Sequence, residues 1–174
     1  MAHEFITGLN HVSGSFRDYG LSMTTATGQR LDIAKLAPEV YKAMIALDAA
    51  ARKGLEPTLV ELVLTRASQL NHCAWCLDMH TRDARKVGVT EQKLYLLNAW
   101  EEARGMYSDR ERSAFALTEA VTVLTDGFVP DEVYNEAAGE FSDEELAQLI
   151  SVIFTINAWN RIAVTTRKAP PVRD

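Results

Sequence analysis

Apolar residues recur along most of the chain at intervals of three and four positions, which is the spacing of one face of an α-helix. The segment that follows Pro57 shows this pattern most clearly. Its apolar positions are Leu59, Leu62, Val63, Ala67 and Leu70. No segment keeps the strict alternation of apolar and polar residues that indicates a β-strand. The pattern therefore predicts an all-α protein, a single-domain bundle of about six to seven helices.

Residues that cap helices indicate where the predicted helices begin and end. Two capping boxes, Ser108 with Glu111 and Ser142 with Glu145, open two helices of the C-terminal half. Gly54 provides a C-terminal stop for the first helix. The predicted helices cover approximately residues 38–53, 57–70, 73–88, 90–104, 108–126, a short segment after 130, and 142–165.

The N-terminal residues 1–22 differ from the rest of the chain. They contain glycines and small polar residues without a helical period, so we interpret them as a flexible extension or a cloning remnant, with Met23 as a second plausible start. The helical domain is expected to span residues 23–169, with the mostly apolar stretch 149–156 at its centre. The tail at 170–174 begins with two prolines and is expected to be loose.

Composition and charge exclude several classes of function. The chain has 174 residues, 47% of them hydrophobic and 24% charged, which is ordinary for a globular domain. A formal net charge of −6 without a basic stripe argues against sequence-independent binding of nucleic acid. No apolar run approaches the roughly 20 residues that cross a bilayer, and the N-terminus lacks the apolar stretch of a secretory signal. We therefore expect a cytoplasmic protein that has neither nucleic acid nor a membrane as its partner.

The only two cysteines, Cys73 and Cys76, lie three residues apart. Cytosolic thiol pools keep structural disulfides rare, and a bridge that closes so short a loop removes little chain entropy. The pair is therefore better explained by redox chemistry, catalysis or metal binding than by a contribution to fold stability.

A helix that opens at Cys73 gives this pair a reactive setting. Cys73 and Cys76 then lie about one turn apart, close enough to form a bridge. The positive end of the helix dipole favours the reactive thiolate. His80 follows Cys76 by four residues on the same face, where its imidazole can take up the thiol proton.

Glu61 joins this group if the chain doubles back near Leu70 and Asn71. In an antiparallel helical hairpin, residues equidistant from the turn lie side by side, and Glu61 and His80 are equidistant from that point. The carboxylate could then orient and polarise the imidazole, as the third group of a relay does. Asn71 is a suitable turn residue because asparagine tolerates unusual backbone angles.

Two other interpretations of these residues stay open. Glu61 could simply belong to a solvated polar face with Thr65, Ser68 and His72, which share its helical spacing. A zinc site is the second possibility, although four ligands crowded at one helix start would be strained. Its ligands would be His72, Cys73, Cys76 and His80. A thioredoxin fold is disfavoured because no strands flank the Cys-x-x-Cys motif.

Several stretches resemble the AhpD-like alkylhydroperoxidase branch of the carboxymuconolactone decarboxylase superfamily, over about residues 30–165. The residues that carry the resemblance are Glu61-Leu-Val, Arg66-Ala-Ser-Gln, Cys73-x-x-Cys76-x-x-x-His80-Thr-Arg-Asp-Ala-Arg, Leu94-Tyr-Leu-Leu and Ile156-Asn-Ala-Trp-Asn-Arg161. The resemblance implies an all-helical fold that assembles into homo-oligomers, commonly trimers, hexamers or larger assemblies.

The resemblance also implies hydroperoxide reduction by the cysteine pair, without a cofactor or a metal. Cys76 would be the peroxidatic cysteine and Cys73 the resolving one, with His80 and Glu61 as the proton relay. Helix-terminal activation alone would instead favour Cys73 as the nucleophile. The expected partners are a hydrogen peroxide or organic hydroperoxide substrate and an external dithiol reductant protein. The alternative is a redox sensor or disulfide-exchange protein on the same fold.

One histidine and the three tryptophans have no chemical role in this picture. His72 precedes the first cysteine and has no assigned role. The three tryptophans, Trp75, Trp100 and Trp159, are expected in the core or at a subunit interface, because large aromatic side chains are usually buried.

Overall fold

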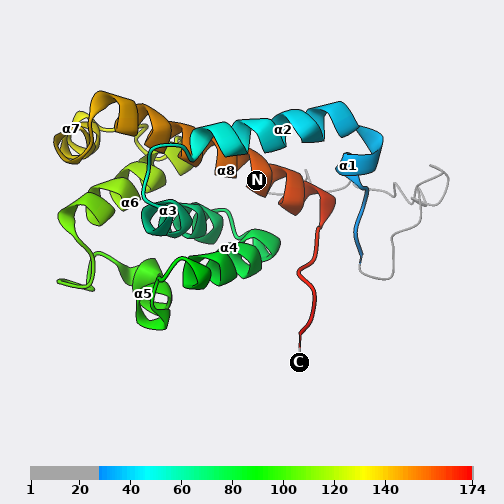
Figure 1. The fold of residues 1–174 in the computed structure, drawn as a ribbon, viewed down its shortest axis with the longest axis horizontal. Helices are drawn as coiled ribbons and strands as arrows, with labels where there is room; N and C mark the ends of the chain where they lie inside the picture. Colours follow the sequence, from blue (N-terminus) through cyan, green and yellow to red (C-terminus); the bar gives the residue numbers. More distant parts are fainter. Residues whose placement is uncertain (1–27, 174) are drawn as a thin grey trace, which may run out of the picture.

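A computed structural model describes residues 28–173 as eight α-helices and one 3₁₀ helix, with no β-strand in that part of the chain (Figure 1). The elements are α1 (Ile33–Leu36), α2 (Pro38–Ala51), α3 (Pro57–Leu70), α4 (Ala74–Lys86), α5 (Glu91–Leu96), η1 (Leu97–Ala99), α6 (Asp109–Thr122), α7 (Asp131–Glu140) and α8 (Asp143–Thr166). The predicted all-α fold is confirmed. The expected N-terminal extension, 1–22, lies outside the described residues.

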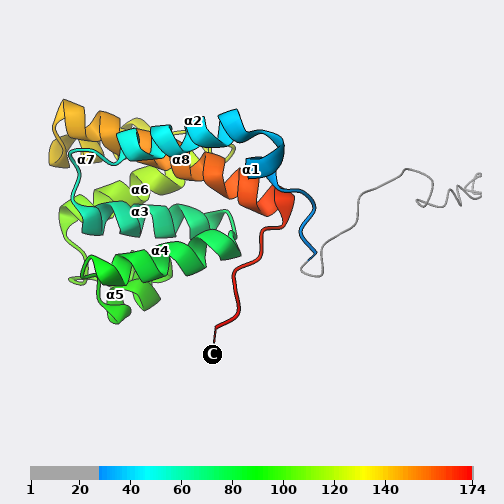
Figure 2. The ribbon, with the colours of Figure 1, turned by 45° about the vertical axis from the view of Figure 1, so that its right-hand side comes forward.

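Helix α3 forms the centre of the bundle. It packs against α4, α6 and α8, while α2 covers another face of α8. Figure 2 shows α2 and α8 along one side of the molecule, α3 next to them, and α4 with α5 on the opposite side. All residues of α3 from 59 to 68 are buried, so any polar side chain in this segment must find a partner inside the protein.

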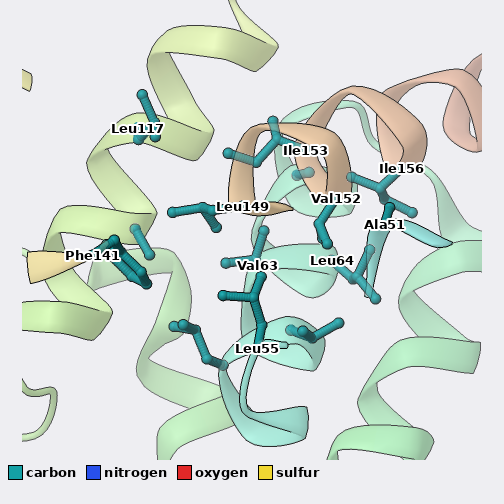
Figure 3. Close-up of a cluster of buried hydrophobic side chains, with 14 of the residues drawn as sticks. Ala51, Leu55, Val63, Leu64, Leu117, Phe141, Leu149, Val152, Ile153 and Ile156 are labelled. Carbon is teal, nitrogen blue, oxygen red and sulfur yellow. The ribbon is translucent and has the colours of Figure 1, made fainter. Parts of the chain in front are cut away.

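The main core lies where α3, α6 and α8 meet (Figure 3). Val63 and Leu64 of α3 pack in one cluster with buried side chains of α8. The α8 members include Leu149, Val152, Ile153 and Ile156. The stretch 149–156 therefore lies in the core as predicted, although Phe154 on its outer face is 45% exposed.

Helix boundaries follow the local signals in some places and depart from them in others. Both predicted capping boxes are present, at Ser108 with Glu111 and at Ser142 with Glu145. Helix α1 was not predicted, because its four residues carry no periodic pattern; the Asp32 side chain caps it by accepting from two backbone N–H groups. Among the described residues, no helix is both long enough and apolar enough to cross a membrane.

The segment predicted as one helix over 90–104 is shorter in the structure. Helix α5 gives way to the 3₁₀ turn η1, and irregular turns follow it. The chain bends there because Leu97, Trp100 and Tyr107 are all buried in one cluster with Phe115 of α6. Tertiary packing has overridden the local helical pattern.

Candidate active site

The turn between α3 and α4 positions the cysteine pair. Residue His72 adopts the left-handed conformation with φ of 52°, where Asn71 had been expected to do so; Asn71 has an ordinary φ of −84°. His72 N–H donates to the carbonyl of Gln69 at 3.1 Å, and Cys73 N–H donates to that of Ser68 at 3.0 Å. These two bonds form a Schellman motif, which ends α3 and reverses the chain.

Asn71 is needed at this turn for its side chain. Its Nδ2 donates to the Oδ1 atoms of Asn157 at 2.8 Å and Asn160 at 2.9 Å, both on α8. Asn160 in turn donates from Nδ2 to the Ser68 hydroxyl at 3.1 Å. This amide network holds the α3–α4 turn against α8, and it gives the asparagines of the 156–161 motif a structural role.

Glu61 and His80 meet across the hairpin, as the spacing about the turn predicted. The His80 Nδ1 and Glu61 Oε2 atoms are 2.9 Å apart, and the two residues are 2% and 6% exposed. Glu61 therefore does not belong to a solvated polar face. Thr65 and Ser68, the neighbours on that face, are also buried, and each donates to the backbone carbonyl four residues earlier.

The second oxygen of Glu61 binds a residue that the sequence did not indicate. Arg52, at the C-terminal end of α2, donates from Nη1 to Glu61 Oε1 at 2.8 Å. Asp48 holds Arg52 through a fork, with Nε to Oδ2 at 2.8 Å and Nη2 to Oδ1 at 3.3 Å. Burial alone lowers the pKa of Arg52, but the hydrogen bonds and charges of Asp48 and Glu61 raise it overall. Arg52 is thus a fixed cation beside the Glu61 carboxylate.

Cys73 caps the N-terminus of α4, as expected for a helix that opens there. Its Sγ accepts from the backbone N–H of Cys76 at 3.4 Å. The two Cα atoms are 5.3 Å apart and the sulfur atoms are paired as a disulfide, which agrees with the usual Cα spacing of such bridges. Both cysteines are buried, with exposures of 1% and 2%.

A pocket of about 320 Å³ reaches one of the two cysteines. It lies between α2, α4 and α8, and its lining includes Cys76 and His80 but not Cys73. The other lining residues are Tyr41, Ile45, Asp48, Arg52, Trp75, Met79, Asp83, Trp159, Ile162, Ala163 and Lys168. The pocket is mostly apolar, and Cys76 and His80 both lie on the wall that α4 forms.

The tryptophans divide between the core and this pocket. Trp100 is buried in the cluster around Phe115, as expected. Trp75 and Trp159 are only partly buried and line the pocket. Tyr41 packs edge-on against Trp159, with ring centroids 5.2 Å apart. This contact helps to fix the orientation of the two rings in the pocket wall.

The four residues of the hypothetical zinc site are not arranged as a ligand set. No group of three or more His, Cys, Asp or Glu within residues 28–173 is placed to hold a metal ion. His72 is exposed at the turn, and the Nδ1 of His80 is taken by Glu61.

Sequence comparison places the chain among known relatives. Residues 38–120 match the carboxymuconolactone decarboxylase family. The uncharacterized protein YdfG of Bacillus subtilis (strain 168) is 40% identical over 137 residues, which span 78% of this chain and 92% of YdfG.

Solved structures show the same fold. A protein of unknown function from Agrobacterium tumefaciens, described as a candidate AhpD antioxidant defence protein, superposes with a TM-score of 0.80. It is 38% identical, and the match covers 83% of this chain and 99% of that one. An uncharacterized peroxidase-related protein with an AhpD core from Ralstonia eutropha JMP134 shares the fold at 18% identity, with a TM-score of 0.69 over 79% of this chain and 74% of its own. The chain belongs to the carboxymuconolactone decarboxylase family and is an AhpD-like member of it.

Proposed function

We propose that the protein is a thiol-dependent peroxidase that reduces hydrogen peroxide or organic hydroperoxides through a dithiol/disulfide cycle. The observation that carries the proposal is the meeting of three groups at one pocket. Cys76 and His80 line it together, and His80 is bonded to the buried carboxylate of Glu61. A nucleophile, a base and a group that orients the base are the parts of an activated nucleophilic site.

In this proposal Cys76 is the peroxidatic residue and Cys73 the resolving one. Cys76 lines the pocket that a hydroperoxide can enter, whereas Cys73 does not. Cys73 is the N-cap residue of α4 and Cys76 lies in its first turn, so both are at the end where the helix dipole stabilises a thiolate. Pocket access therefore supports Cys76, although the position at the helix start would favour Cys73.

Glu61 orients the imidazole of His80 through the contact with Nδ1. A carboxylate paired with Arg52 can only accept, so the proton between Glu61 and His80 lies on Nδ1 of the imidazole. In the neutral imidazole the other ring nitrogen, Nε2, is the acceptor, and we assign it to take up the thiol proton of Cys76. The same group returns a proton to the departing alkoxide.

The reaction balances with the cysteines as the source of electrons. The Cys76 thiolate attacks the distal peroxide oxygen and the O–O bond breaks. The alcohol departs, and Cys76 is left as a sulfenic acid. Cys73 then attacks that sulfur, water departs, and the disulfide forms. An external dithiol protein is proposed as the partner that reduces the disulfide by exchange. No cofactor enters this cycle.

Steady turnover distinguishes this proposal from a redox sensor or a disulfide-exchange protein. The assay follows consumption of cumene hydroperoxide while dithiothreitol is supplied in excess. A peroxidase consumes many equivalents of hydroperoxide per protomer. Hydroperoxide consumption no faster than that caused by dithiothreitol alone would favour the sensor or the disulfide-exchange protein.

Replacing Arg52 by Met is expected to slow oxidation of the thiols by about tenfold, because Glu61 loses the donor that fixes one of its oxygens. The rate constant is measured by stopped flow with cumene hydroperoxide. Arg110→Met is the matched control, since Arg110 forms a similar pair with Glu145 and does not line the pocket. Equal oxidation rates in the two variants would show that Arg52 does not support the action of Glu61 and His80.

The proposal includes assembly into a homo-oligomer, a trimer or a hexamer. Large apolar side chains are exposed on the described surface, and subunit contacts would remove them from water. They include Leu36, Val40, Ile45, Leu124 and Phe128. Light scattering of the purified protein is expected to give the mass of three or six chains, and the mass of one chain would contradict the assembly.

A further inference from the structure

The pocket beside Cys76 is larger than hydrogen peroxide requires. Its volume of about 320 Å³ falls within the range of pockets for small organic ligands. A water-sized molecule occupies about 30 Å³, so hydrogen peroxide would leave most of the space empty. Tyr41, Trp75 and Trp159 provide aromatic walls that suit an apolar body.

The charged residues of the pocket lie at two different ends. Helix α4 lines it from Trp75 to Asp83, which is a distance of about 12 Å along the helix axis. Asp83 therefore marks one end of the pocket. Arg52 lies on the same side, because it is bonded to Glu61, which in turn contacts His80. Lys168 lies at the other end, with its Nζ over the Trp75 ring, 4.0 Å from the centroid.

The charges at the first end are already paired. Arg52 is held by Asp48 and Glu61. Asp83 accepts from Lys86 at 2.6 Å. Because each cation at that end is already paired with a carboxylate, this end of the pocket does not attract an anion.

Lys168 differs from these groups. No carboxylate among residues 28–173 pairs with its ammonium, which rests on the face of Trp75 by a cation–π contact. Its backbone is fixed at the end of α8, where its N–H donates to the Ala163 carbonyl at 2.9 Å. Trp75 and Ala163 pack against both cysteines in one small cluster. The ammonium is thus held close to the reactive end of α4, which also carries the positive end of the helix dipole.

We propose that the pocket selects organic hydroperoxides that carry a carboxylate, with Lys168 as the residue that binds it. This inference rests on the proposed peroxidase function and names its substrate class. The apolar body of the substrate lies against the aromatic walls, the hydroperoxide meets Cys76, and the carboxylate pairs with Lys168. The products are the corresponding hydroxy acid and water, and the two electrons come from the cysteine pair.

The test compares two substrates that differ in a single charge: cumene hydroperoxide with a para carboxylate, and the methyl ester of that acid. The acid is ionised at pH 7. The wild-type protein is expected to show a kcat/KM for the acid about tenfold above that for the ester, a difference of about 1.4 kcal/mol. The ratio should fall as salt is added, because the partly exposed pair is screened.

Variants of Lys168 assign the preference to this residue. In K168M the ratio of acid to ester is expected to fall to about one, whereas K168R, which keeps the charge, should retain it. Arg167→Met is the matched control, since Arg167 is the neighbouring cation at the end of α8 and does not line the pocket. If Lys168 serves only to stabilise the helix end, K168M lowers the melting temperature and leaves the ratio unchanged.

The outcomes separate this inference from the function on which it rests. Equal turnover of acid and ester by the wild-type protein would overturn the carboxylate preference and leave the peroxidase intact. A preference that survives in K168M would overturn the role of Lys168. Turnover of neither substrate would overturn the peroxidase proposal and the inference together.

Discussion

Replacing Cys76 by Ser is expected to reduce hydroperoxide turnover by about 10³-fold or more, because the serine hydroxyl cannot replace the thiolate as the nucleophile. The measurement is steady-state consumption of cumene hydroperoxide with dithiothreitol. Cys76 contacts the pocket and Cys73 does not, so the two cysteines should respond differently to substitution.

Cys73→Ser is the matched variant for this prediction. It should still undergo the first oxidation, leaving a sulfenic acid on Cys76 that dimedone can trap. Normal turnover in Cys76→Ser, or a sulfenic acid trapped by dimedone on Cys73 of that variant, would show that the two roles have been assigned the wrong way round.

Replacing Glu61 by Gln is expected to slow thiol oxidation by about 10²-fold, which lies in the range of general acid–base effects. The neutral amide keeps the size of the side chain but loses the charge that orients His80. The variant should remain folded, because Arg52 keeps its fork to Asp48. The measurement is the stopped-flow rate of oxidation near neutral pH, together with circular dichroism.

Glu119→Gln provides the control for Glu61→Gln. Glu119 also accepts from an arginine, at 2.8 Å from Arg66 Nε, but it does not line the pocket. The Glu119 variant should oxidise at the wild-type rate. If Glu61→Gln did so too, the carboxylate would have only a structural role.

The contact between Glu61 and His80 could be anticipated because the two residues lie on consecutive helices joined by a tight turn. Glu61 and His80 are separated from that turn by equal numbers of residues. A helical hairpin therefore brings them together independently of how the other helices pack. The sequence did not show in the same way which residue of the turn adopts the left-handed backbone conformation. Asn71 and His72 compete for that position, and contacts with α8 decide between them.

The contact of Arg52 with Glu61 could not be anticipated because it depends on how α2 packs. In the sequence, Asp48 and Arg52 form an ordinary pair four residues apart on a helix. Only the packing of the bundle brings the guanidinium to Glu61. Lys168 is a similar case, since its place over Trp75 depends on how the chain leaves α8. The charges that surround the relay and the pocket are tertiary features.

The proposed function requires that Cys73 and Cys76 form a dithiol that a hydroperoxide oxidises. The most direct test is titration of free thiols on the reduced protein before and after one equivalent of cumene hydroperoxide. We predict that both thiols are lost and that dithiothreitol restores them. Two unreacted thiols after treatment would contradict the account.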